Sequence, residues 1–556
     1  MNDSTLSPTS VAAVAAADAP PTMEPPPQRL RIVFSLLHSG YLRHYAEPIR
    51  LLCARGHAVH LALYRPDAKD RGDDRLLERL LADCPTVTAA AAPRRRRVDG
   101  WRPFSWMVRA LVDVLRYAEP RFAHATALRE RAAEKVRTRV NESRVDPLSR
   151  LLVLRAVDWV AGTPDAERAR RLTKLLAAIE LAIPTSRRVD RLLEEYGADV
   201  VLASPVVDIG SPQVEFIKSA LRLGIPCAIC VASWDNLTNK GLLRVVPDRV
   251  IVWNEVQRRE LEEMHGIPRD RVVTTGGQKF DAWFDRRSTR KRKEFLGTVG
   301  LDPSRPYVLY LCSSVFIAPD EVGFVRRWIR ALRESDDERL RELGILVRPH
   351  PQNAAQWAGV DLAELDEVRV WPREGEYPDE ASAQNDFYDS VAHSVGVVGV
   401  NTTAQIEAGI VGKPVYTILD PQFAHTQSGT LHFHYLLHEN GGFVRRAADL
   451  DEHVLQLGQG LEDPAAAEAD VLAFIETFVR PRGFAQPVTP IVAAEIEALA
   501  LMPANQRRTR TVRNAALRLL LSPVAFAMGA AAVPGAAWYH LHPPRISDRG
   551  RSETAR

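Results

Sequence analysis

Short apolar segments alternate with amphipathic helical segments along most of the chain, and this alternation limits the fold more than any other feature. The first apolar runs lie at 31–37 and 58–63, and between them apolar residues recur three and four positions apart, as on one face of a helix. Further apolar runs follow at 199–203, 225–231 and 249–253. A strand, a helix and a second strand form the βαβ unit, so this series predicts a parallel sheet covered by helices.

A second series of the same kind occupies the later half of the chain. Its apolar runs lie at 307–312, 345–347, 368–371, 395–398 and 415–419. Neither half contains the glycine-rich fingerprint of a dinucleotide-binding domain. The fold class is therefore predicted as α/β, with two Rossmann-like domains that face each other across an interdomain cleft. A length of 556 residues is sufficient for both domains and for appended segments.

Changes in composition suggest where the domains begin and end. The first residues are rich in Ala, Pro, Ser and Thr, the region before the third apolar run is rich in Arg and helical in pattern, and the segment between the two series is highly charged. We predict a disordered tail at 1–28, a first domain at 29–277 with a helical insertion at about 86–188, a linker at 278–304, a second domain at 305–480, a helix that crosses back at 481–505 and a C-terminal helical tail at 506–556.

The charge balance and the cysteines narrow the class of protein. The chain has 73 basic and 70 acidic residues, which is too even a balance for a protein that binds nucleic acid over its whole surface. Its five cysteines show no spacing typical of a secreted disulfide scaffold, which favours the cytoplasm.

The C-terminal tail combines a basic segment with a long segment free of charge. No Asp, Glu, Lys or Arg occurs between Leu519 and Pro544, although Pro523 and Pro534 interrupt this stretch. One interpretation is an interfacial anchor at the inner face of the plasma membrane; the other is a helix docked on the protein's own body. The Arg-rich insertion has the same two interpretations, peripheral contact with an anionic membrane or a solvated helical face.

Polar residues follow several strands of the second half, where open α/β sheets bind their ligands. Asn401, Thr402 and Thr403 begin a helix, whose free N–H groups and dipole attract a phosphate, and Glu407 lies one turn further on. These residue types are also common helix caps, so the motif alone leaves both interpretations open.

Other candidate ligand-binding residues of the second half follow neighbouring strands. Arg348 suits phosphate oxygens bidentately, and His350, held between two prolines, is a hydrogen-bond donor to a phosphate or a leaving group. The set predicted to bind a nucleotide is completed by residues of two further loops: Ser313 and Ser314 in one, Thr430 and His432 in the other.

In the first half, the loop after the first strand contains His38 and Gly40, and a later loop contains Trp234, Asp235 and Asn236. His38 or Asp235 is predicted to remove a proton from an acceptor hydroxyl. Gly40, Trp234 and Asn236 are predicted to contact the acceptor, with the indole as an apolar platform for a sugar ring. The alternative for both loops is a polar turn that satisfies its own backbone.

Several catalytic motifs are absent from the sequence. It contains no P-loop, no H-E-x-x-H and no G-x-S-x-G, and no D-x-D pair directly follows a predicted strand. A metal-independent reaction is therefore expected, with cationic side chains and helix dipoles holding a diphosphate as it leaves.

Three motifs together resemble those of GT-B-fold proteins of bacterial surface-polysaccharide assembly: R-P-H-P around His350, N-T-T-x-x-x-E-A from Asn401, and W-D-N-L-T around Asp235. The chain is similar to capsule polysaccharide synthesis and CDP-glycerol glycerophosphotransferase-like proteins, and more distantly to UDP-N-acetylglucosamine 2-epimerases. The likeness extends over roughly 29–500.

The resemblance implies a glycosyltransferase that moves a sugar, or a related group such as glycerol phosphate, from a nucleotide-activated donor to a glycan or lipid-linked precursor of a cell-envelope polysaccharide. The donor is a substrate, and no cofactor is implied. Two alternatives stay open: an isomerase similar to the 2-epimerases, and a non-catalytic component of polysaccharide assembly or export.

Overall fold

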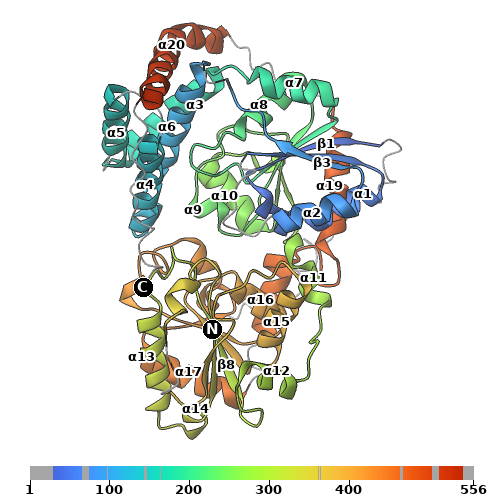
Figure 1. Cartoon of the computed structure of the whole chain (residues 1–556), viewed down its shortest axis with the longest axis vertical. Helices are drawn as coiled ribbons and strands as arrows, with labels where there is room; N and C mark the ends of the chain where they lie inside the picture. Colours follow the sequence, from blue (N-terminus) through green and yellow to red (C-terminus); the bar gives the residue numbers. More distant parts are fainter. Residues whose placement is uncertain are drawn as a thin grey trace, which may run out of the picture.

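The structure, a computed structural model, describes residues 29–64, 74–96, 98–142, 147–162, 165–360, 362, 365–463, 468–503 and 512–541. The predicted tail at 1–28 lies outside the described residues. Two parallel sheets form the two halves of the molecule, one above the other in Figure 1. The predicted fold class is confirmed: the chain is α/β with two Rossmann-like domains in a GT-B-like arrangement.

The first sheet has seven parallel strands in the order β3-β2-β1-β4-β5-β6-β7. Its strands are β1 (Arg31–Leu36), β2 (Ala58–Leu63), β3 (Val87–Ala91), β4 (Val200–Ser204), β5 (Cys227–Cys230), β6 (Arg249–Val252) and β7 (Val272–Thr274). The strand order reverses direction between β1 and β4, which is the point where doubly wound sheets bind ligands.

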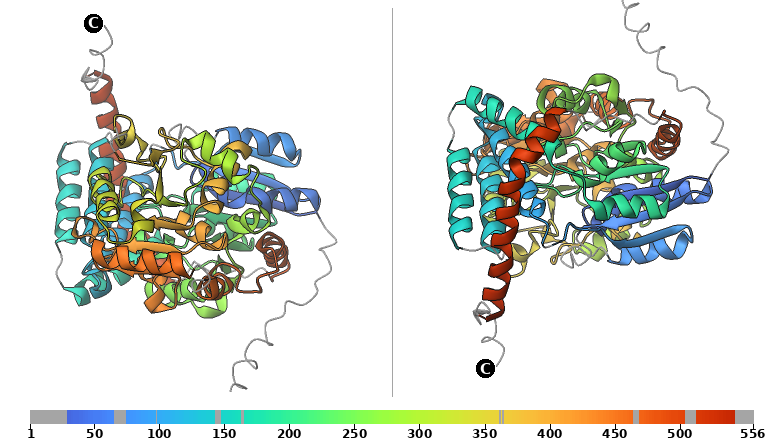
Figure 2. Two further views of the ribbon diagram at one scale, coloured as in Figure 1. Left: turned by 90° about the horizontal axis from the view of Figure 1, so that it is seen from below. Right: turned by 90° about the horizontal axis from the view of Figure 1, so that it is seen from above.

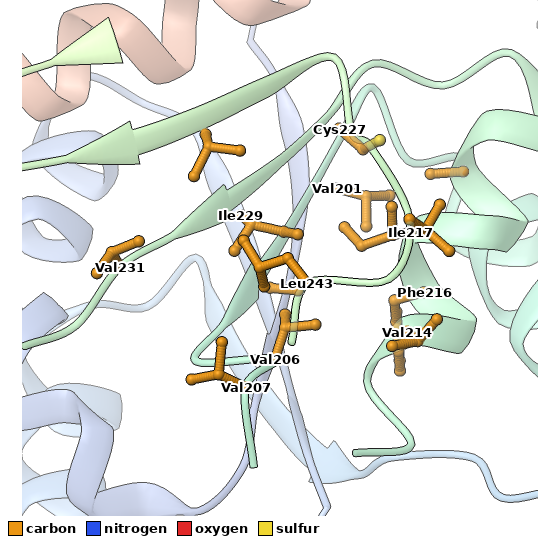
Figure 3. Packing of buried hydrophobic residues seen from close by; sticks show 14 of the residues in the cluster. Val201, Val206, Val207, Val214, Phe216, Ile217, Cys227, Ile229, Val231 and Leu243 are labelled. Carbon is orange, nitrogen blue, oxygen red and sulfur yellow. The ribbon is translucent and has the colours of Figure 1, made fainter. Parts of the chain in front are cut away.

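Both faces of this sheet are buried, which explains why its strands appear as continuous apolar runs. Along β1, Val33 packs into one hydrophobic cluster, and Ile32 and Phe34 pack into another on the opposite face. Figure 3 shows the first of these clusters, in which Val201 and Ile229 come from neighbouring strands.

The second sheet has six parallel strands in the order β10-β9-β8-β11-β12-β13. Its strands are β8 (Tyr307–Leu311), β9 (Gly344–Arg348), β10 (Val368–Val370), β11 (Gly396–Gly399), β12 (Val415–Ile418) and β13 (Val444–Ala447). The order has the same reversal, between β8 and β11, so each half repeats the same plan.

Helices connect the strands in both halves. Those of the first are α1 (Leu42–Ala54), α2 (Asp74–Asp83), α3 (Trp101–Leu115), α4 (Thr126–Glu142), α5 (Pro147–Ala161), α6 (Ala166–Ala182), α7 (Arg187–Tyr196), α8 (Val214–Leu223), α9 (Asn236–Asn239) and α10 (Glu255–His265). Those of the linker and second half are α11 (Asp281–Asp285), α12 (Arg292–Val299), α13 (Val322–Arg333), α14 (Glu338–Arg341), α15 (Ala381–Ala392), α16 (Ala404–Ile410), α17 (Leu450–Glu462) and α18 (Glu468–Phe474).

The helical insertion begins later than the sequence suggested. The range 86–188 includes β3, which pairs with β2 as the edge strand of the first sheet. Its residues are mostly Thr and Ala, and most of them are exposed, which explains why no apolar run predicted this strand. The helices α3 to α6 form the insertion itself, and they stand beside the first domain (Figure 1).

The last helices return to the first domain. A short π-helix at Ile475–Val479 follows α18, and α19 (Val488–Ala500) then packs on α1. The final helix, α20 (Val512–Leu541), lies on α3 and α6 of the insertion. Pro523 and Pro534 were expected to interrupt this stretch, but the helix continues through both. Pro523 is exposed, so water can satisfy the carbonyl group that the proline leaves without its helical partner.

Within the described residues, no helix is both long and apolar enough to cross a membrane.

Candidate functional site

The carboxyl edges of the two sheets meet, and we call this contact the interdomain junction. It is formed by the loop at 233–241 of the first domain, the turn at 401–407 of the second, and the short helix at His432–Tyr435. Parallel strands of one sheet end at the same edge, so the polar residues that follow them gather there. The structure thus brings together residues from the two halves of the chain that the sequence marked separately.

Trp234 is the centre of this contact. Its indole Nε1 donates a hydrogen bond to Thr403 Oγ1 across the junction, at 3.1 Å. The same indole meets the ring of His432 edge to face, with 5.0 Å between the centroids. Thr238, on α9, is 3.1 Å from His432 Nδ1 through its hydroxyl. Two of the predicted donor residues therefore contact the predicted acceptor loop directly.

Asp235 is held by the amides of its own loop. Asn236 Nδ2 donates to one carboxylate oxygen at 3.2 Å, and Asn239 Nδ2 donates to the other at 2.5 Å. Burial opposes ionisation, but Lys240 and His432 outweigh it and hold the pKa of Asp235 well below its ordinary value. A carboxylate of such low pKa is a weak base, so Asp235 is better suited to accept a hydrogen bond or attract a cation than to remove a proton.

Two lysines bring positive charge to the junction. Burial lowers the pKa of Lys240, but Tyr41, Asp235 and Asp208 raise it more, so the ammonium stays charged. Lys279, after β7, lies 3.5 Å from Glu407 Oε1 of the second domain. Burial raises the pKa of Glu407, and Lys279 opposes that effect. The carboxyl group of Glu407, which the sequence placed one turn after the phosphate-binding motif, is thus already paired across the junction.

His38, which follows β1, and His350, which follows β9, share a local geometry. Gly40 N–H donates to Nδ1 of His38 at 3.2 Å, and Gln352 N–H donates to Nδ1 of His350 at 3.1 Å. A neutral ring that accepts at Nδ1 carries its proton on Nε2, which makes Nε2 a donor. Burial lowers the pKa of His350 to about 4, so this histidine is a neutral donor at pH 7.

Two of the predicted donor residues have partners inside the second domain. The Arg348 guanidinium pairs with Asp386 at 2.9 Å and lies over the ring of Phe387. The Thr430 hydroxyl donates to the carbonyl of Gln427 at 2.7 Å. These side chains support the loops of the sheet edge; they do not point freely into the junction.

The start of the turn at 401 is tied to the first strand of its sheet. Asn401 N–H donates to Ser313 Oγ at 3.3 Å, and Ser313 N–H donates to the buried carboxyl of Glu321 at 2.9 Å. Thr402 caps α16 by accepting from Ala404 N–H at 3.4 Å. Ser314 is partly exposed beside this group, and its carbonyl accepts from the backbone of the loop.

Several buried polar atoms around the junction have no hydrogen-bond partner among the described residues. They are Asn236 Oδ1 and Asn239 Oδ1 in the acceptor loop, Asn401 Nδ2 opposite, and His44 Nδ1 on α1. Buried polar atoms in native proteins are almost always paired, and an unpaired atom costs about 1–3 kcal/mol. Three of these atoms belong to the first domain and one to the second, and a polar molecule bound at the junction would give them partners.

A recess of about 370 Å³ opens at the same edge of the second sheet, beyond the end of β10. Trp371 forms one wall, Ser382 and Ala383 at the start of α15 form another, and Asp386 lies at the bottom. Asp386 accepts from Arg348 and Arg290 and from the indole of Trp371 at 3.2 Å. The loop that follows Trp371 reaches the first domain, where Asp379 pairs with Arg43.

Sequence reasoning missed four residues of the junction. Lys240 and Lys279 are each at the end of a loop after a strand of the first sheet, a position that could have marked them. His44 is one turn into α1, and burial together with Lys279, Lys240 and Arg43 lowers its pKa well below the ordinary value. Arg131 comes from the insertion and donates to Asn239 O at 2.6 Å, which no local pattern announces.

Among the described residues, no group of three or more His, Cys, Asp or Glu side chains has the arrangement of a metal site.

Comparison with solved structures gives matches of low sequence identity. UDP-GlcNAc 2-epimerase from Neisseria meningitidis, bound to UDP-GlcNAc, is similar over 84% of this chain and 100% of its own, with 12% identity and a TM-score of 0.45. A glycosyltransferase from Rickettsia africae is similar over 85% of this chain and 99% of its own, with 9% identity and a TM-score of 0.46. The chain matches no protein-family model, and no match is found among curated proteins.

Proposed function

We propose that the protein is a glycosyltransferase that moves a sugar, or a related group such as glycerol phosphate, from a nucleotide-activated donor to a precursor of a cell-surface polysaccharide. The observation that supports this most is the set of four unpaired polar atoms at the interdomain junction, contributed by both domains. A two-substrate transfer needs such a shared surface, because the donor and the acceptor must be held against each other.

In this reaction the bond between the sugar and the diphosphate breaks, and negative charge develops on the departing phosphate. Lys240 and Lys279 supply positive charge at the place where the two edges meet. Nε2 of His350 adds a neutral N–H donor. Fixed donors of this kind stabilise developing charge without having to reorganise, which is how a metal-independent transfer would proceed.

The acceptor hydroxyl loses its proton as it attacks. Asp235 is a weak base because of its low pKa, so we assign it the orientation of the hydroxyl and assign proton removal to His38. Nε2 of His38 accepts a proton only in the tautomer that carries hydrogen on Nδ1, so the bond from Gly40 N–H must break first. His38 would then become a base at Nε2 only when the acceptor displaces the loop that contains Gly40.

The recess beyond β10 is proposed to hold the base of the nucleotide. Trp371 offers an aromatic wall for stacking, and the polar side chains of Ser382 and Asn385 line the same space. Arg348, whose partner Asp386 forms the bottom, would then support the recess without touching phosphate.

A binding panel tests the donor site. Isothermal titration of UDP, GDP, CDP and dTDP against the wild type, Lys240→Gln and Lys293→Gln separates the junction lysine from an exposed lysine on α12. We expect one nucleotide to bind the wild type and Lys293→Gln equally, and Lys240→Gln about tenfold more weakly because a charge-assisted bond to phosphate is lost. Absence of binding by every nucleotide to folded protein would favour the non-catalytic alternative.

An isomerase related to the 2-epimerases is the second candidate, and one pair of groups favours it. Burial raises the pKa of Glu260 to about 8, with Asp235 adding to the effect, while the pKa of Asp235 itself is low. Carboxyl groups with widely separated pKa values are typical of an acid and a base in one site. Incubation of the bound donor without any acceptor decides between them: a transferase leaves the sugar unchanged apart from slow hydrolysis, whereas an isomerase converts it.

A further inference from the structure

The outward face of α20 is more apolar than the face that packs on the protein. The face that packs on the insertion contains Asn514, Leu517, Arg518, Leu521, Ser522, Ala525, Met528 and Gly529. The face that points to solvent contains Val512, Arg513, Ala515, Ala516, Leu519, Leu520, Pro523, Val524, Phe526 and Ala527. A surface helix ordinarily buries its apolar side, so an outward face with a single charged residue calls for a partner.

Close packing holds α20 in this orientation. A Cβ atom on Gly100 would lie 2.0 Å from the carbonyl oxygen of Ala525, so the helix backbone rests directly on the glycine. Arg518 Nε donates to the carbonyl of Ala182 at 2.9 Å, and Leu521 and Met528 pack against Phe104 of α3. Rotating the helix to bury its apolar side would break each of these contacts.

The outward residues are well exposed. Relative exposures are 78% for Leu519, 72% for Leu520 and 78% for Phe526. Leu181, at the end of α6, is also exposed, and so is Val98, whose carbonyl lies beside Gly529. These residues extend the apolar surface from α20 onto the insertion. Figure 2 shows α20 lying across the first domain and running past its edge.

The helix α20 itself carries no acidic residue. No Asp or Glu occurs between Val512 and Leu541, where Arg513 is exposed. Beside α20 a recess of about 420 Å³ has an excess of basic over acidic side chains, together with the apolar side chains of Leu181 and Ile183. Its basic residues are Arg187, Arg191, Lys218, Arg222 and Arg518, and its acidic residues are Asp190 and Glu194. Apolar side chains bordered by arginines match the chemistry of a phospholipid surface, where acyl chains lie under phosphate groups.

We propose that the outward face of α20, defined as Val512 to Ala527 on its exposed side, docks on an anionic phospholipid bilayer and lies along its surface. A second copy of the chain is the other occupant to consider. In a symmetric dimer through this face, two helices with only positive charge would lie against each other, which is unfavourable. An anionic bilayer would bury the apolar side chains of this face and attract the arginines beside them.

This inference goes beyond the transfer reaction, and it has a consequence for the acceptor. α20 packs on α3. Arg116, the residue that follows α3, donates to the carbonyl groups of Lys240 and Gly241 at 2.8 and 3.0 Å. The loop of the junction is thus one helix away from the docking face. A lipid-linked acceptor would reach the site from that side.

Vesicle co-sedimentation of the full chain tests the proposal. The probes are phosphatidylcholine vesicles, with or without phosphatidylglycerol, at about 0.1 M and 0.5 M NaCl. The variant is the double substitution L520E and F526E, and the matched control is L455E, which changes a leucine of 67% exposure on α17 of the second domain. We expect the wild type and L455E to bind anionic vesicles, with weaker binding at high salt, and the double variant to bind at least about tenfold more weakly.

Circular dichroism and the thermal midpoint of each variant show whether it is folded. Arg513→Gln provides an independent measurement, because removing one surface arginine should weaken binding to anionic vesicles about fivefold and leave the fold intact. Binding that is unaffected by the double substitution, or no binding of the folded wild type to anionic vesicles, overturns the proposal. So does a dimer in light scattering that the double substitution converts to monomer while vesicles stay unbound. None of these results depends on nucleotide binding, so the failure of the transferase proposal would be seen separately.

Discussion

The inner and outer sides of the helical insertion are built in opposite ways. Inside, Arg109 is buried between Glu180 and Glu215, and the side chains of all three residues are at most 5% exposed. Outside, α20 presents leucine and phenylalanine to solvent. Charges lie where apolar residues are expected, and apolar residues lie where charges are expected.

The comparison teaches that the two sides have different requirements. The inner charges are satisfied within the chain, since Lys218 and Arg95 complete the group around the two glutamates. They fix the position of the insertion, and therefore of the loop that Arg116 holds, at a cost in desolvation. The exposed apolar residues of α20 pack against nothing in the described part of the chain. The inner side should therefore be sensitive to substitution in the free protein, and the outer side only when its partner is present.

Asp113→Ala should have the largest effect. Asp113 is fully buried, accepts from Gly210 N–H and Leu242 N–H at 2.8 Å, and pairs with Arg244. Removing it leaves a buried arginine without its counter-ion, which costs about 3–5 kcal/mol of unfolding free energy. Urea unfolding followed by tryptophan fluorescence measures the loss. Asp158→Ala is the control, since Asp158 is 59% exposed and pairs with Arg137 at the surface, where a pair contributes about 0–1 kcal/mol. An equal loss in both variants would contradict the comparison.

The next largest effect is expected from acid, which should weaken the buried ion pairs around Glu215. Burial alone would raise the pKa of Glu215, but Arg95, Arg109 and Lys218 lower it to about 2. Because the folded pKa lies below the unfolded value of about 4.3, this carboxylate stabilises the fold above that pH, and the stabilisation is lost as pH falls toward 2. Each such group contributes a slope of at most about 1.4 kcal/mol per pH unit.

Urea midpoints measured from pH 6 to pH 3, a range chosen around the unfolded value of about 4.3, give this slope. Glu215→Gln should have lower stability at neutral pH and a smaller slope below about pH 5. A slope that is unchanged in Glu215→Gln would show that this carboxylate does not carry the acid sensitivity.

Gly100→Ala should weaken the packing of α20 on Gly100, with a smaller effect on stability than the changes above. The backbone at Gly100 tolerates alanine, but the added methyl group meets the carbonyl of Ala525, so the helix must shift at a cost of about 1–3 kcal/mol. Trypsin cleavage after Arg518 would become faster. Gly297→Ala, in a helix where the methyl group meets nothing within 4 Å, is the control and should leave cleavage at Arg518 unchanged. If both variants are cleaved at the wild-type rate, α20 is not seated on Gly100 as described.

Leu520→Ser should have the smallest effect. In lipid-free solution its unfolding free energy should lie within about 0.5 kcal/mol of the wild type, because the side chain is already exposed. Differential scanning calorimetry makes the measurement. A loss as large as that of Asp113→Ala would mean that the outward face of α20 is covered by the protein itself, and the comparison would fail.

Much of the fold could be predicted from the sequence. Strands buried on both faces, such as β1 and β8, appear as continuous apolar runs, and the two series of runs were sufficient to predict two Rossmann-like domains. Three of the four edge strands of these two sheets were missed: β3 is mostly Thr and Ala, and β7 and β13 have only three and four residues. An edge strand buries little apolar surface, so its sequence carries a weaker signal.

The candidate site could be predicted only by location. The loops after the strands were the right places to look, and Trp234, Thr403 and His432 do meet there. The role of each side chain depends on partners distant in sequence. The sequence suggested that Arg348 binds phosphate, and the structure pairs it with Asp386. Nothing in the sequence around Arg131 predicts its hydrogen bond to the carbonyl of Asn239.

By itself, the sequence determined the two parallel sheets, the polar loops at their carboxyl edges and the apolar, basic character of the C-terminal helix. Periodicity and composition are local properties, and they follow from the order of residues along the chain. Only the tertiary structure decided which side of α20 faces solvent, because that depends on Gly100 and Ala182 accepting the polar side of the helix. It also decided which charges pair, since Coulomb energy and desolvation depend on distance and burial, which sequence separation does not fix.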